Sequence, residues 1–393
     1  MRFPEFQGEW EKCKLGDIAT LTKGSGISKD QRSATGTPCI LYGELYTTYK
    51  SEVINYVVNK TDISDKNLVR SCANDIIIPS SGETAIDIST ARCVLSPDVL
   101  LGGDLNIIRL KDGDGRFFSY QLNGVRKHDI AKIAQGVSVV HLYGESIKGL
   151  TVSFPSNKEQ QKISTLLSLI DERIATQSKL IEKLESLIKG LNDSLYAQYG
   201  GKVLTSFAEL GTSYSGLSGK SAQDFGSGKP FITYLNVYSN NVINENEFQY
   251  VAIKDDEKQN VAEYGDVLFT LSSETPREVG IGSVYLGKEK VYLNSFCFGI
   301  HITNAEIAFP PYLSYYVSST PFRKFVYPYA QGSTRFNLCK ADFEKASIKL
   351  PTLENQKRIY SILSHIDNKI ITERQMLDLY NSQKQYLLRQ MFI

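Results

Sequence analysis

One pattern occurs twice in this sequence, and the repeat constrains the fold more than any other feature. Both copies have the form Pro-x4-Gln-x2-Ile-x3-Leu-x3-Asp, from Pro155 to Asp171 and from Pro351 to Asp367, 196 residues apart. The tripeptide Ala-Gln-Gly at 134–136 recurs at 330–332, at the same distance. Repetition at a fixed interval predicts two copies of one structural unit.

Earlier segments repeat at slightly shorter intervals. Residues 38–42 match 230–234, and 81–84 match 272–275, a drift that loop insertions produce. We therefore expect a mixed domain at 1–155, a spacer helix at 156–198, a second mixed domain at 199–350 and a second spacer helix at 351–393.

The mixed domains are predicted to be α+β. In the first copy, short runs rich in β-forming residues alternate with Gly, Asn and Asp turns. These runs are Cys39–Leu45, Ile76–Pro79, Asn106–Leu110 and Val137–Leu142. A helical stretch is expected near Phe117–Ile133, with a counterpart near Pro311–Tyr327. The predicted fold has two similar mixed α/β domains, separated by two long antiparallel coiled-coil helices and related by a pseudo-two-fold repeat.

The spacer helices have clear start signals. A proline precedes Ser156 in one copy and Thr352 in the other, both natural N-cap residues, and Glu159 stands where a capping box requires it. Apolar residues then recur at heptad spacing, and both helices keep one register because the repeat distance is a multiple of seven. Each helix would be about 60 Å long at about 1.5 Å per residue.

The apolar faces of these helices are wide enough to bury against more than one partner. We expect the two helices to pair with each other inside the chain; an ordinary core helix or an oligomerising coiled coil is the alternative. The predicted partner-binding residues on these faces are Ile163, Leu167, Ile170, Ile174, Ile181, Leu184, Ile188, Ile359, Leu363, Ile366, Ile370 and Leu377.

Composition restricts the classes of function. The 393 residues carry 44 Lys and Arg against 43 Asp and Glu, so a lone DNA-binding protein is disfavoured unless charge is sorted onto one face or a partner contributes. The six cysteines stand singly, which argues against zinc and disulfide frameworks. The start lacks a signal-peptide pattern and the apolar runs are strand-sized, so we expect a cytoplasmic protein.

Several resemblances to catalytic motifs are incomplete. Phe309 begins a Phe-Pro-Pro-Tyr segment where adenine-N6 methyltransferases need an amide, and helix-starting prolines explain the segment better. Gly219-Lys220-Ser221 ends like a phosphate-binding loop, but Tyr214 replaces its first glycine. The acidic turn at 112–115 lacks the later ligands of a calcium loop, and the four histidines are isolated. No catalytic residue and no metal site is predicted.

A duplicated, diverged domain on a stiff helical spacer fits a split DNA site, because equivalent positions recur on one duplex face about 34–36 Å apart. The chain also resembles the specificity subunits of Type I restriction–modification systems over essentially its whole length. The residues that carry this resemblance are Trp10-x4-Leu15-Gly16-Asp17-Ile18, Asn74-Asp75-Ile76-Ile77, Gln331-Gly332-Ser333-Thr334-Arg335-Phe336-Asn337-Leu338-x4-Phe343 and the repeated helix start.

The resemblance implies two target-recognition domains that each read half of a bipartite double-stranded DNA site. It also implies a non-catalytic subunit that joins two adenine-methylating modification subunits and two ATP-dependent restriction subunits. S-adenosylmethionine, ATP and Mg would then be bound by the partners, not by this chain. The first domain departs from this pattern. Its residues 135–142 read Gln-Gly-Val-Ser-Val-Val-His-Leu, whereas residues 331–338 of the second domain have the full Gln-Gly-Ser-Thr-Arg-Phe-Asn-Leu motif, so a role for the arginine is expected at Arg335 only.

Polar residues at strand ends in repeated loops are the candidate DNA contacts, because such side chains can reach base edges in a groove. For each one, a role as a turn or solvated loop residue is the alternative. The candidates are Lys23, Tyr42, Glu44, Ser80, Ser81, Glu83, Thr84, Lys220, Tyr234, Asn236, Ser272, Ser273, Glu274, Arg277 and Arg335.

Two other functions remain open at this point. A fused methyltransferase or nuclease would need a cofactor loop or a carboxylate cluster, and the sequence offers neither. A purely structural coiled-coil scaffold would bind no DNA sequence even when partner subunits are present. The bases that each domain reads, and the length of the unread spacer, do not follow from the sequence.

Overall fold

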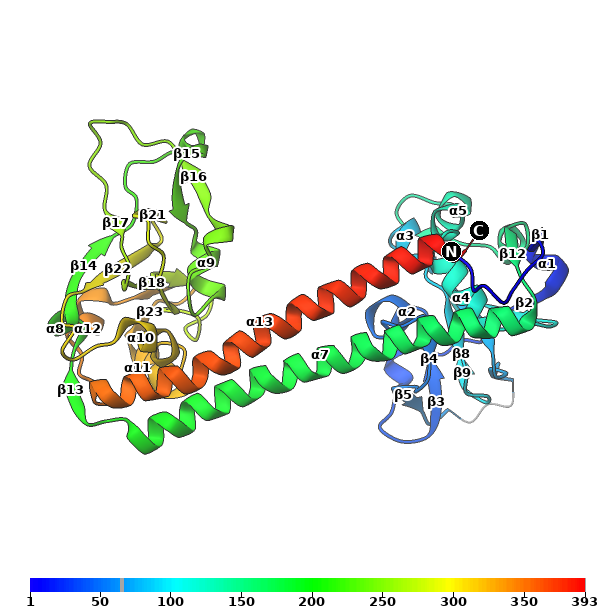
Figure 1. Ribbon diagram of the computed structural model, residues 1–393, viewed down its shortest axis with the longest axis horizontal. Helices are drawn as coiled ribbons and strands as arrows, with labels where there is room; N and C mark the ends of the chain where they lie inside the picture. Colours follow the sequence, from blue (N-terminus) through cyan, green and yellow to red (C-terminus); the bar gives the residue numbers. More distant parts are fainter. Residues whose placement is uncertain (64–66, 393) are drawn as a thin grey trace. The chain divides into compact units, whose positions relative to one another are not determined.

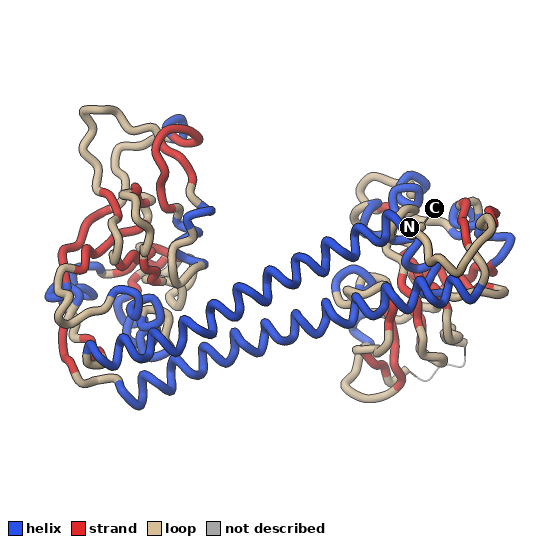
Figure 2. The backbone as a smooth tube through the Cα atoms, viewed as in Figure 1, coloured by secondary structure: helices blue, strands red, loops and turns tan. Residues whose placement is uncertain are grey.

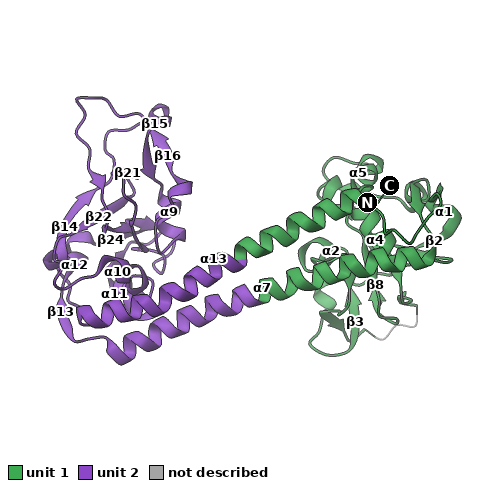
Figure 3. Ribbon diagram, in the orientation of Figure 1, with its two compact units in different colours: residues 1–179, 374–393 green, residues 180–373 purple. Residues whose placement is uncertain are grey.

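The computed structural model describes residues 1–63 and 67–392. It divides into two compact units: unit 1 contains 1–179 and 374–393, and unit 2 contains 180–373 (Figure 3). Each unit therefore holds one mixed α/β domain and one end of each long helix. The domain boundaries expected from the sequence remain a prediction, and Ile393 of the predicted second spacer helix lies outside the described residues.

Unit 1 contains a five-stranded sheet with the order β2-β10-β6-β8-β4 and a three-stranded sheet with the order β5-β3-β9. Two further strand pairs, β1 with β12 and β7 with β11, complete it. Its strands are β1 (Glu11–Lys14), β2 (Ala19–Lys23), β3 (Thr37–Ile40), β4 (Val53–Ile54), β5 (Asn59–Thr61), β6 (Asp75–Pro79), β7 (Ser81–Gly82), β8 (Arg92–Val94), β9 (Leu100–Leu101), β10 (Leu105–Leu110), β11 (Val140–His141) and β12 (Thr151–Phe154).

The helices of unit 1 are short, apart from its portions of the two long helices (Figure 2). They are α1 (Leu15–Ile18), the 3-10 turn η1 (Lys29–Gln31), α2 (Glu44–Thr47), α3 (Ala85–Ile88), α4 (Gly115–Asn123), α5 (Lys127–Ile133), α6 (Gly144–Lys148), the start of α7 (Asn157–Tyr199) and the end of α13 (Leu353–Gln390).

Unit 2 contains the four-stranded sheets β14-β22-β18-β20 and β16-β15-β21-β17, the pair β13-β25 and the three-stranded sheet β19-β24-β23. Its strands are β13 (Val203–Thr205), β14 (Gly211–Ser215), β15 (Phe225–Ile232), β16 (Gln249–Val251), β17 (Val261–Ala262), β18 (Val267–Thr270), β19 (Ser272–Ser273), β20 (Gly282–Val284), β21 (Val291–Leu293), β22 (Cys297–Ile302), β23 (Ala330–Gln331), β24 (Phe336–Leu338) and β25 (Ile348–Leu350). Its helices are α8 (Phe207–Leu210), η2 (Ala222–Asp224), α9 (Tyr234–Ser239), η3 (Glu245–Glu247), α10 (Pro310–Tyr316), α11 (Thr320–Val326), η4 (Tyr327–Tyr329), α12 (Lys340–Lys345) and the start of α13 (Leu353–Gln390).

The predicted internal repeat is visible in the strand orders of the two units. The order β2-β10-β6-β8 in unit 1 corresponds to β14-β22-β18-β20 in unit 2, and β5-β3-β9 corresponds to β16-β15-β21. The equivalent strands β3 and β15 each run antiparallel to one neighbour and parallel to the other. The predicted α+β class and the duplication of the mixed domain are therefore confirmed.

The two long helices, α7 and α13, each begin in one unit and end in the other (Figures 1 and 3). In unit 1, Lys384 Nζ of α13 lies 2.6 Å from Asp171 Oδ1 of α7. In unit 2, the Arg358 guanidinium lies 5.4 Å from the ring centre of Tyr199. Because the later residues of one helix meet the earlier residues of the other in both units, the helices pair antiparallel in each, as the sequence predicted.

The shared Gln of the repeated pattern has the same contacts in both copies. Gln160 is buried, accepts the Asp114 N–H at 3.0 Å and donates to the Pro155 carbonyl at 2.8 Å. Gln356 accepts the Phe309 N–H at 2.8 Å and donates to the Pro351 carbonyl at 2.9 Å. Each glutamine thus ties the start of a long helix to the start of a domain helix, α4 or α10, which gives the pattern a structural reason.

Two local expectations are corrected. The helical stretches predicted near 117–133 and 311–327 are each two helices, because Gly124 ends α4 and Ser319 caps a new helix that has Pro321 in its first turn. The predicted capping box at the start of α7 is replaced by an ion pair, because both carboxylate oxygens of Glu159 accept hydrogen bonds from Arg2 at 2.7 Å.

Candidate nucleic-acid interface

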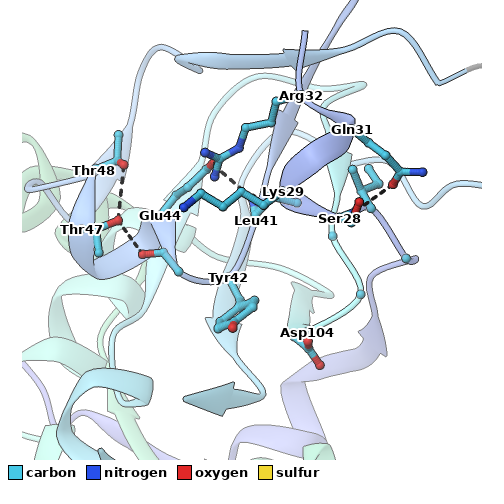
Figure 4. A pocket seen from close by; sticks show the side chains of 15 residues that line it. Ser28, Lys29, Gln31, Arg32, Leu41, Tyr42, Glu44, Thr47, Thr48 and Asp104 are labelled. Atoms are coloured by element: carbon cyan, nitrogen blue, oxygen red, sulfur yellow. Dashed lines mark hydrogen bonds and ion pairs between the residues drawn. The ribbon is translucent and has the colours of Figure 1, made fainter. Parts of the chain in front are cut away.

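A hollow of about 800 Å³ opens in unit 1 between three loops (Figure 4). This unit 1 hollow is lined by residues 26–29, 31–32, 41–44, 47–48 and 102–104. Two of the loops follow β3 and β9, which run parallel with Cys39 opposite Leu100. Because parallel strands bring their carboxyl ends to the same edge of a sheet, the chain leaves both strands on the same side of the hollow.

A buried carboxylate organises one wall of the unit 1 hollow. Glu44 is 3% exposed; its Oε2 accepts the Leu41 N–H at 3.1 Å, and its Oε1 accepts Asn59 Nδ2 at 2.8 Å. Oε1 also accepts a hydrogen bond from Arg32 Nη2. Burial raises the pKa of Glu44, and the three donors act in the opposite direction. Figure 4 shows Arg32 and Lys29 beside this carboxylate.

The strand-end loop predicted at 80–84 is tied to the same region. The Ser80 N–H donates to the carbonyl of Asp104, a residue of the unit 1 hollow, at 2.8 Å, and its carbonyl accepts the Leu142 N–H at 2.9 Å. The next residues form β7, which pairs with β11. The structure therefore brings this loop beside the Gln-Gly loop at 135–139, a segment that is exposed throughout.

Unit 2 repeats this arrangement with different side chains. Its strand-end loop forms β19, which pairs with β24, and β24 pairs with β23 across the exposed loop 332–335. The Tyr234 hydroxyl donates to the Ser272 carbonyl at 2.8 Å. The Arg335 guanidinium lies 5.9 Å from the ring centre of Phe296, and both residues are exposed.

The predicted contact residues fall into two groups by exposure. Those with accessible side chains are Lys23, Tyr42, Ser81, Glu83 and Thr84 in unit 1, and Tyr234, Ser273, Glu274, Arg277 and Arg335 in unit 2, of which Ser81, Tyr234 and Ser273 are half-buried. Lys23 lies in a second hollow of unit 1, of about 390 Å³, with Asn106, Tyr143 and Lys148.

Five other predicted contact residues have positions that suit local structure better than DNA contact. Glu44, Ser80, Asn236 and Ser272 are at most 8% exposed, so their side chains have almost no surface to offer a base. Lys220 contacts other residues of the chain. Its ammonium donates hydrogen bonds to the Ala252 carbonyl at 2.7 Å and to the Glu257 carboxylate at 2.5 Å. Their burial and pairing do not support the prediction that these five contact DNA.

The predicted partner-binding faces of the helices need a similar correction. Ile163, Leu167 and Ile170 belong to the core of unit 1, and Ile359 and Leu363 belong to the core of unit 2. Ile181 and Ile370 are also buried, and the remaining five, Ile174, Leu184, Ile188, Ile366 and Leu377, are half-buried. These faces pack inside the chain, because the paired helices and the domains cover them.

Exposed apolar residues lie elsewhere on the long helices. They are Leu169, Leu180, Leu187, Ile362, Ile371, Met376, Leu379 and Tyr386. Leu180 and Leu187 belong to one of the heptad registers in the sequence, but the sequence does not tell which register faces solvent.

Arg32, Lys29 and Phe296 were not among the predicted contacts. Arg32 and Lys29 line the unit 1 hollow, and exposed Phe296 lies beside Arg335. The predicted contacts are polar residues at strand ends in loops that both copies have, whereas Arg32 follows the 3-10 turn η1, and the matching turn of unit 2 is followed by Phe225. No sequence pattern would have selected it.

Two negative findings hold for residues 1–63 and 67–392. None of the helices there combines the length and apolar character needed to cross a bilayer. In the same part of the chain, no three His, Cys, Asp or Glu side chains gather in a way that could hold a metal ion. The prolines of the Phe-Pro-Pro-Tyr segment start α10, as predicted.

Comparison with known proteins identifies the family to which the chain belongs. A family model for the Type I restriction modification DNA specificity domain matches residues 7–186 and 212–379. The chain belongs to this family. Two separate matches of one domain model also agree with the duplication seen in the strand orders.

Relatives of this specificity-domain protein include two from Methanocaldococcus jannaschii. The putative type I restriction enzyme MjaX specificity subunit is 26% identical over 408 aligned residues, which cover 94% of this chain and 89% of the relative. The type I restriction enzyme MjaIX specificity subunit is 24% identical over 188 residues, covering 46% of this chain and 42% of the relative.

Solved structures share the fold. The crystal structure of the Type I restriction-modification S subunit from M. genitalium matches with a TM-score of 0.60 and 16% identity, over 100% of this chain and 99% of that one. A chain from a study of complex assembly and conformational transition of the type I R-M system matches with a TM-score of 0.59 and 15% identity, over 98% and 97%. At these identities the likeness concerns the fold alone.

Proposed function

We propose that this protein gives a Type I restriction–modification complex its DNA sequence specificity by reading a bipartite site, one half-site per unit. The observation that carries the proposal is that the two units share their strand orders but differ in the side chains at the equivalent loops. A common scaffold with different contact residues is what two different half-sites require. The proposed contacts are the candidates with accessible side chains. They are Lys23, Tyr42, Ser81, Glu83 and Thr84 in unit 1, and Tyr234, Ser273, Glu274, Arg277 and Arg335 in unit 2.

The proposal includes partner subunits. The near-neutral net charge of +1 supplies little overall attraction for a phosphate backbone, so part of the grip on DNA would come from other chains. The exposed apolar residues of α7 and α13, such as Leu169, Leu187 and Leu379, offer docking area for two modification subunits, which methylate adenine. Two ATP-dependent restriction subunits would join for cleavage. S-adenosylmethionine, ATP and Mg would be bound by these partners.

Footprinting of the complex assembled with its modification subunits tests this function. We expect sequence-dependent protection of two short segments separated by an unprotected or sequence-independent spacer. A purely structural scaffold would give no sequence-dependent protection. Methyl transfer to DNA by the purified chain alone would instead support a fused methyltransferase, and the proposal would be withdrawn.

A further inference from the structure

The unit 1 hollow contains an arginine, Arg32, whose orientation is fixed by hydrogen bonds within the protein. Glu44 holds Arg32 Nη2, and the Leu41 N–H and Asn59 Nδ2 hold Glu44 in turn. A side chain held by such a network keeps its conformation in the absence of a ligand. Little conformational entropy is therefore lost when a ligand binds.

The guanidinium has donors to spare. Among the described residues, the hydrogen bonds found for the Arg32 guanidinium use only Nη2, which leaves Nη1 and one N–H of Nη2 for a ligand, whereas Nε is buried and out of a ligand's reach. The Arg32 side chain is 29% exposed, so part of it remains accessible from the hollow. A planar group with unused donors at a fixed position suits a ligand that presents two acceptors side by side.

The major-groove edge of guanine presents such acceptors, O6 and N7, and a two-pronged contact from arginine is the commonest specific contact to a base. Phosphate also accepts from arginine, but the Glu44 carboxylate offsets the charge that a phosphate would seek. Lys29 is the better phosphate ligand in this hollow, because it is exposed and no ion pair with it is found in the described chain.

Unit 2 lacks this arrangement at the matching place. Its 3-10 turn η2 is followed by Phe225 instead of an arginine, and Asn236 stands in the place of Glu44. Asn236 Nδ2 donates to the Asn244 carbonyl at 2.9 Å, and its Oδ1 accepts the Asn244 N–H at 3.0 Å, so it braces a loop. The arginine–carboxylate pair is therefore a difference between the two copies.

We propose that Arg32 selects a guanine in the half-site read by unit 1, and that Glu44 is the positioning residue that aims it. This inference rests on the proposed function and adds a base identity to it. It also gives Glu44 a role that its burial permits, acting on DNA through Arg32 instead of touching a base.

The test is a comparison of methylation motifs, mapped on random-sequence DNA with the complex of full-length chain and its modification subunits. The decisive variant is Arg32→Lys, which keeps the positive charge but lacks the paired N–H donors of the guanidinium. We expect the preference for guanine at one position of one half-site to fall about 5- to 150-fold, with the other half-site unchanged. Glu44→Gln should relax the same position.

Two matched controls separate reading from other roles. Arg109 also pairs with a buried carboxylate, since its Nε and Nη2 lie 2.8 and 2.7 Å from Asp75, but it does not line the hollow. Arg109→Lys should leave the motif unchanged, although it disturbs a comparable pair. Lys29→Ala should weaken methylation of all sites alike and lower the slope of log affinity against log salt by about 1.

The possible outcomes are distinct. A wild-type bipartite motif that Arg32→Lys leaves intact, or relaxes at a base other than guanine, would overturn the inference and leave the proposed function standing. If Arg32→Ala weakened methylation of all sites equally and Arg32→Lys did not weaken it, Arg32 would be a phosphate contact. That result would also overturn the inference. The absence of any motif for the wild-type complex would refute the proposed function itself.

Discussion

The side chain of Gln356 illustrates how single residues stabilise this fold. It is fully buried, and it pairs with the Phe309 N–H and with the carbonyls of Ile307 and Pro351. Removing the amide would leave these three backbone groups without a partner in a place that water does not reach. Buried polar groups in that state cost about 1–3 kcal/mol each.

We therefore predict that Gln356→Ala lowers the free energy of unfolding by at least about 1–3 kcal/mol. Urea denaturation measures the change. Gln383→Ala is the matched control, because Gln383 lies on the same helix with an exposed side chain and should shift stability by less than about 0.5 kcal/mol. Equal midpoints for the two variants would show that the buried amide does not stabilise the helix start.

The contacts of Lys220 can also be tested, because its sequence context favoured DNA contact whereas in the structure it pairs with a neighbouring loop. The ammonium donates a hydrogen bond to Glu257, and this bond, helped by Gln259, lowers the pKa of Glu257 to about 2. A depressed carboxyl pKa stabilises the folded loop above the ordinary value near 4.5, and this contribution is lost as the pH falls toward 2.

In Lys220→Met, the pKa of Glu257 should rise toward its ordinary value, which a carboxyl NMR titration measures. The methylation motif should not change. Loss of one half-site in this variant would place Lys220 on the DNA after all, and an unchanged Glu257 titration would mean that the two side chains do not pair in solution.

The sequence located the strand-end loops better than it located the accessible side chains within them. Shared polar positions such as Ser81 and Ser272 mark the correct strand ends, because the duplication preserves the scaffold. Burial of Glu44 could not be predicted, since its partners Arg32 and Asn59 are brought to it by tertiary structure. Arg32 was not predicted because it follows the 3-10 turn η1 and does not stand at a strand end, where the candidates were expected.

Among the elements, the end of α13 has an unusual attachment in unit 1. Lys384 lies between Glu52 and Asp171, and the Tyr120 hydroxyl donates to Asp171 at 2.7 Å. Burial alone would lower the pKa of Lys384, but the two carboxylates together raise it. The last turns of α13 also contribute Leu387 and Leu388 to the unit 1 core, and Phe392, which follows the helix, belongs to the same core.

Replacing Lys384 with Met should leave two buried carboxylates without their cation. We predict a loss of about 3–5 kcal/mol in the stability of unit 1, as for other broken buried pairs. Thermal unfolding and hydrogen exchange of α13 measure it, with Lys158→Met on an exposed position of α7 as the control. A variant as stable as the control would show that apolar packing alone fixes the helix end.

The long helices also give a prediction about DNA. Because α7 and α13 each run without interruption from one unit into the other, four extra residues in both would add one turn, about 6 Å, to the spacer. We expect insertion within Ile174–Lys189 of α7, matched in α13, to lengthen the unread part of the DNA site and keep both half-sites. Unchanged spacing in methylation mapping would mean that the helices do not set it.

Helix starts and the heptad register were predictable because Pro155, Ser156, Pro351 and Thr352 act locally. The faces used for packing were not. Ile163 and Leu167 were expected to bind partner subunits, yet they fill the unit 1 core, because the mixed domain packs on the same apolar stripe as the helix partner. Periodicity identifies an apolar face but does not identify what covers it.

Over the whole chain, the proposed function requires that the two units read DNA independently of each other. Each has its own sheets and its own core, and the equivalent loops carry different side chains, so each should specify its half-site without the other. The family assignment and the repeat agree with this division into two units.

The most direct test is to replace residues 199–350 with the corresponding domain of another specificity subunit and to map the methylation motif of the assembled complex at single-molecule level. We predict that one half-site changes to that of the donor while the other half-site and the spacer are retained. A motif in which both half-sites change, or neither does, would contradict it.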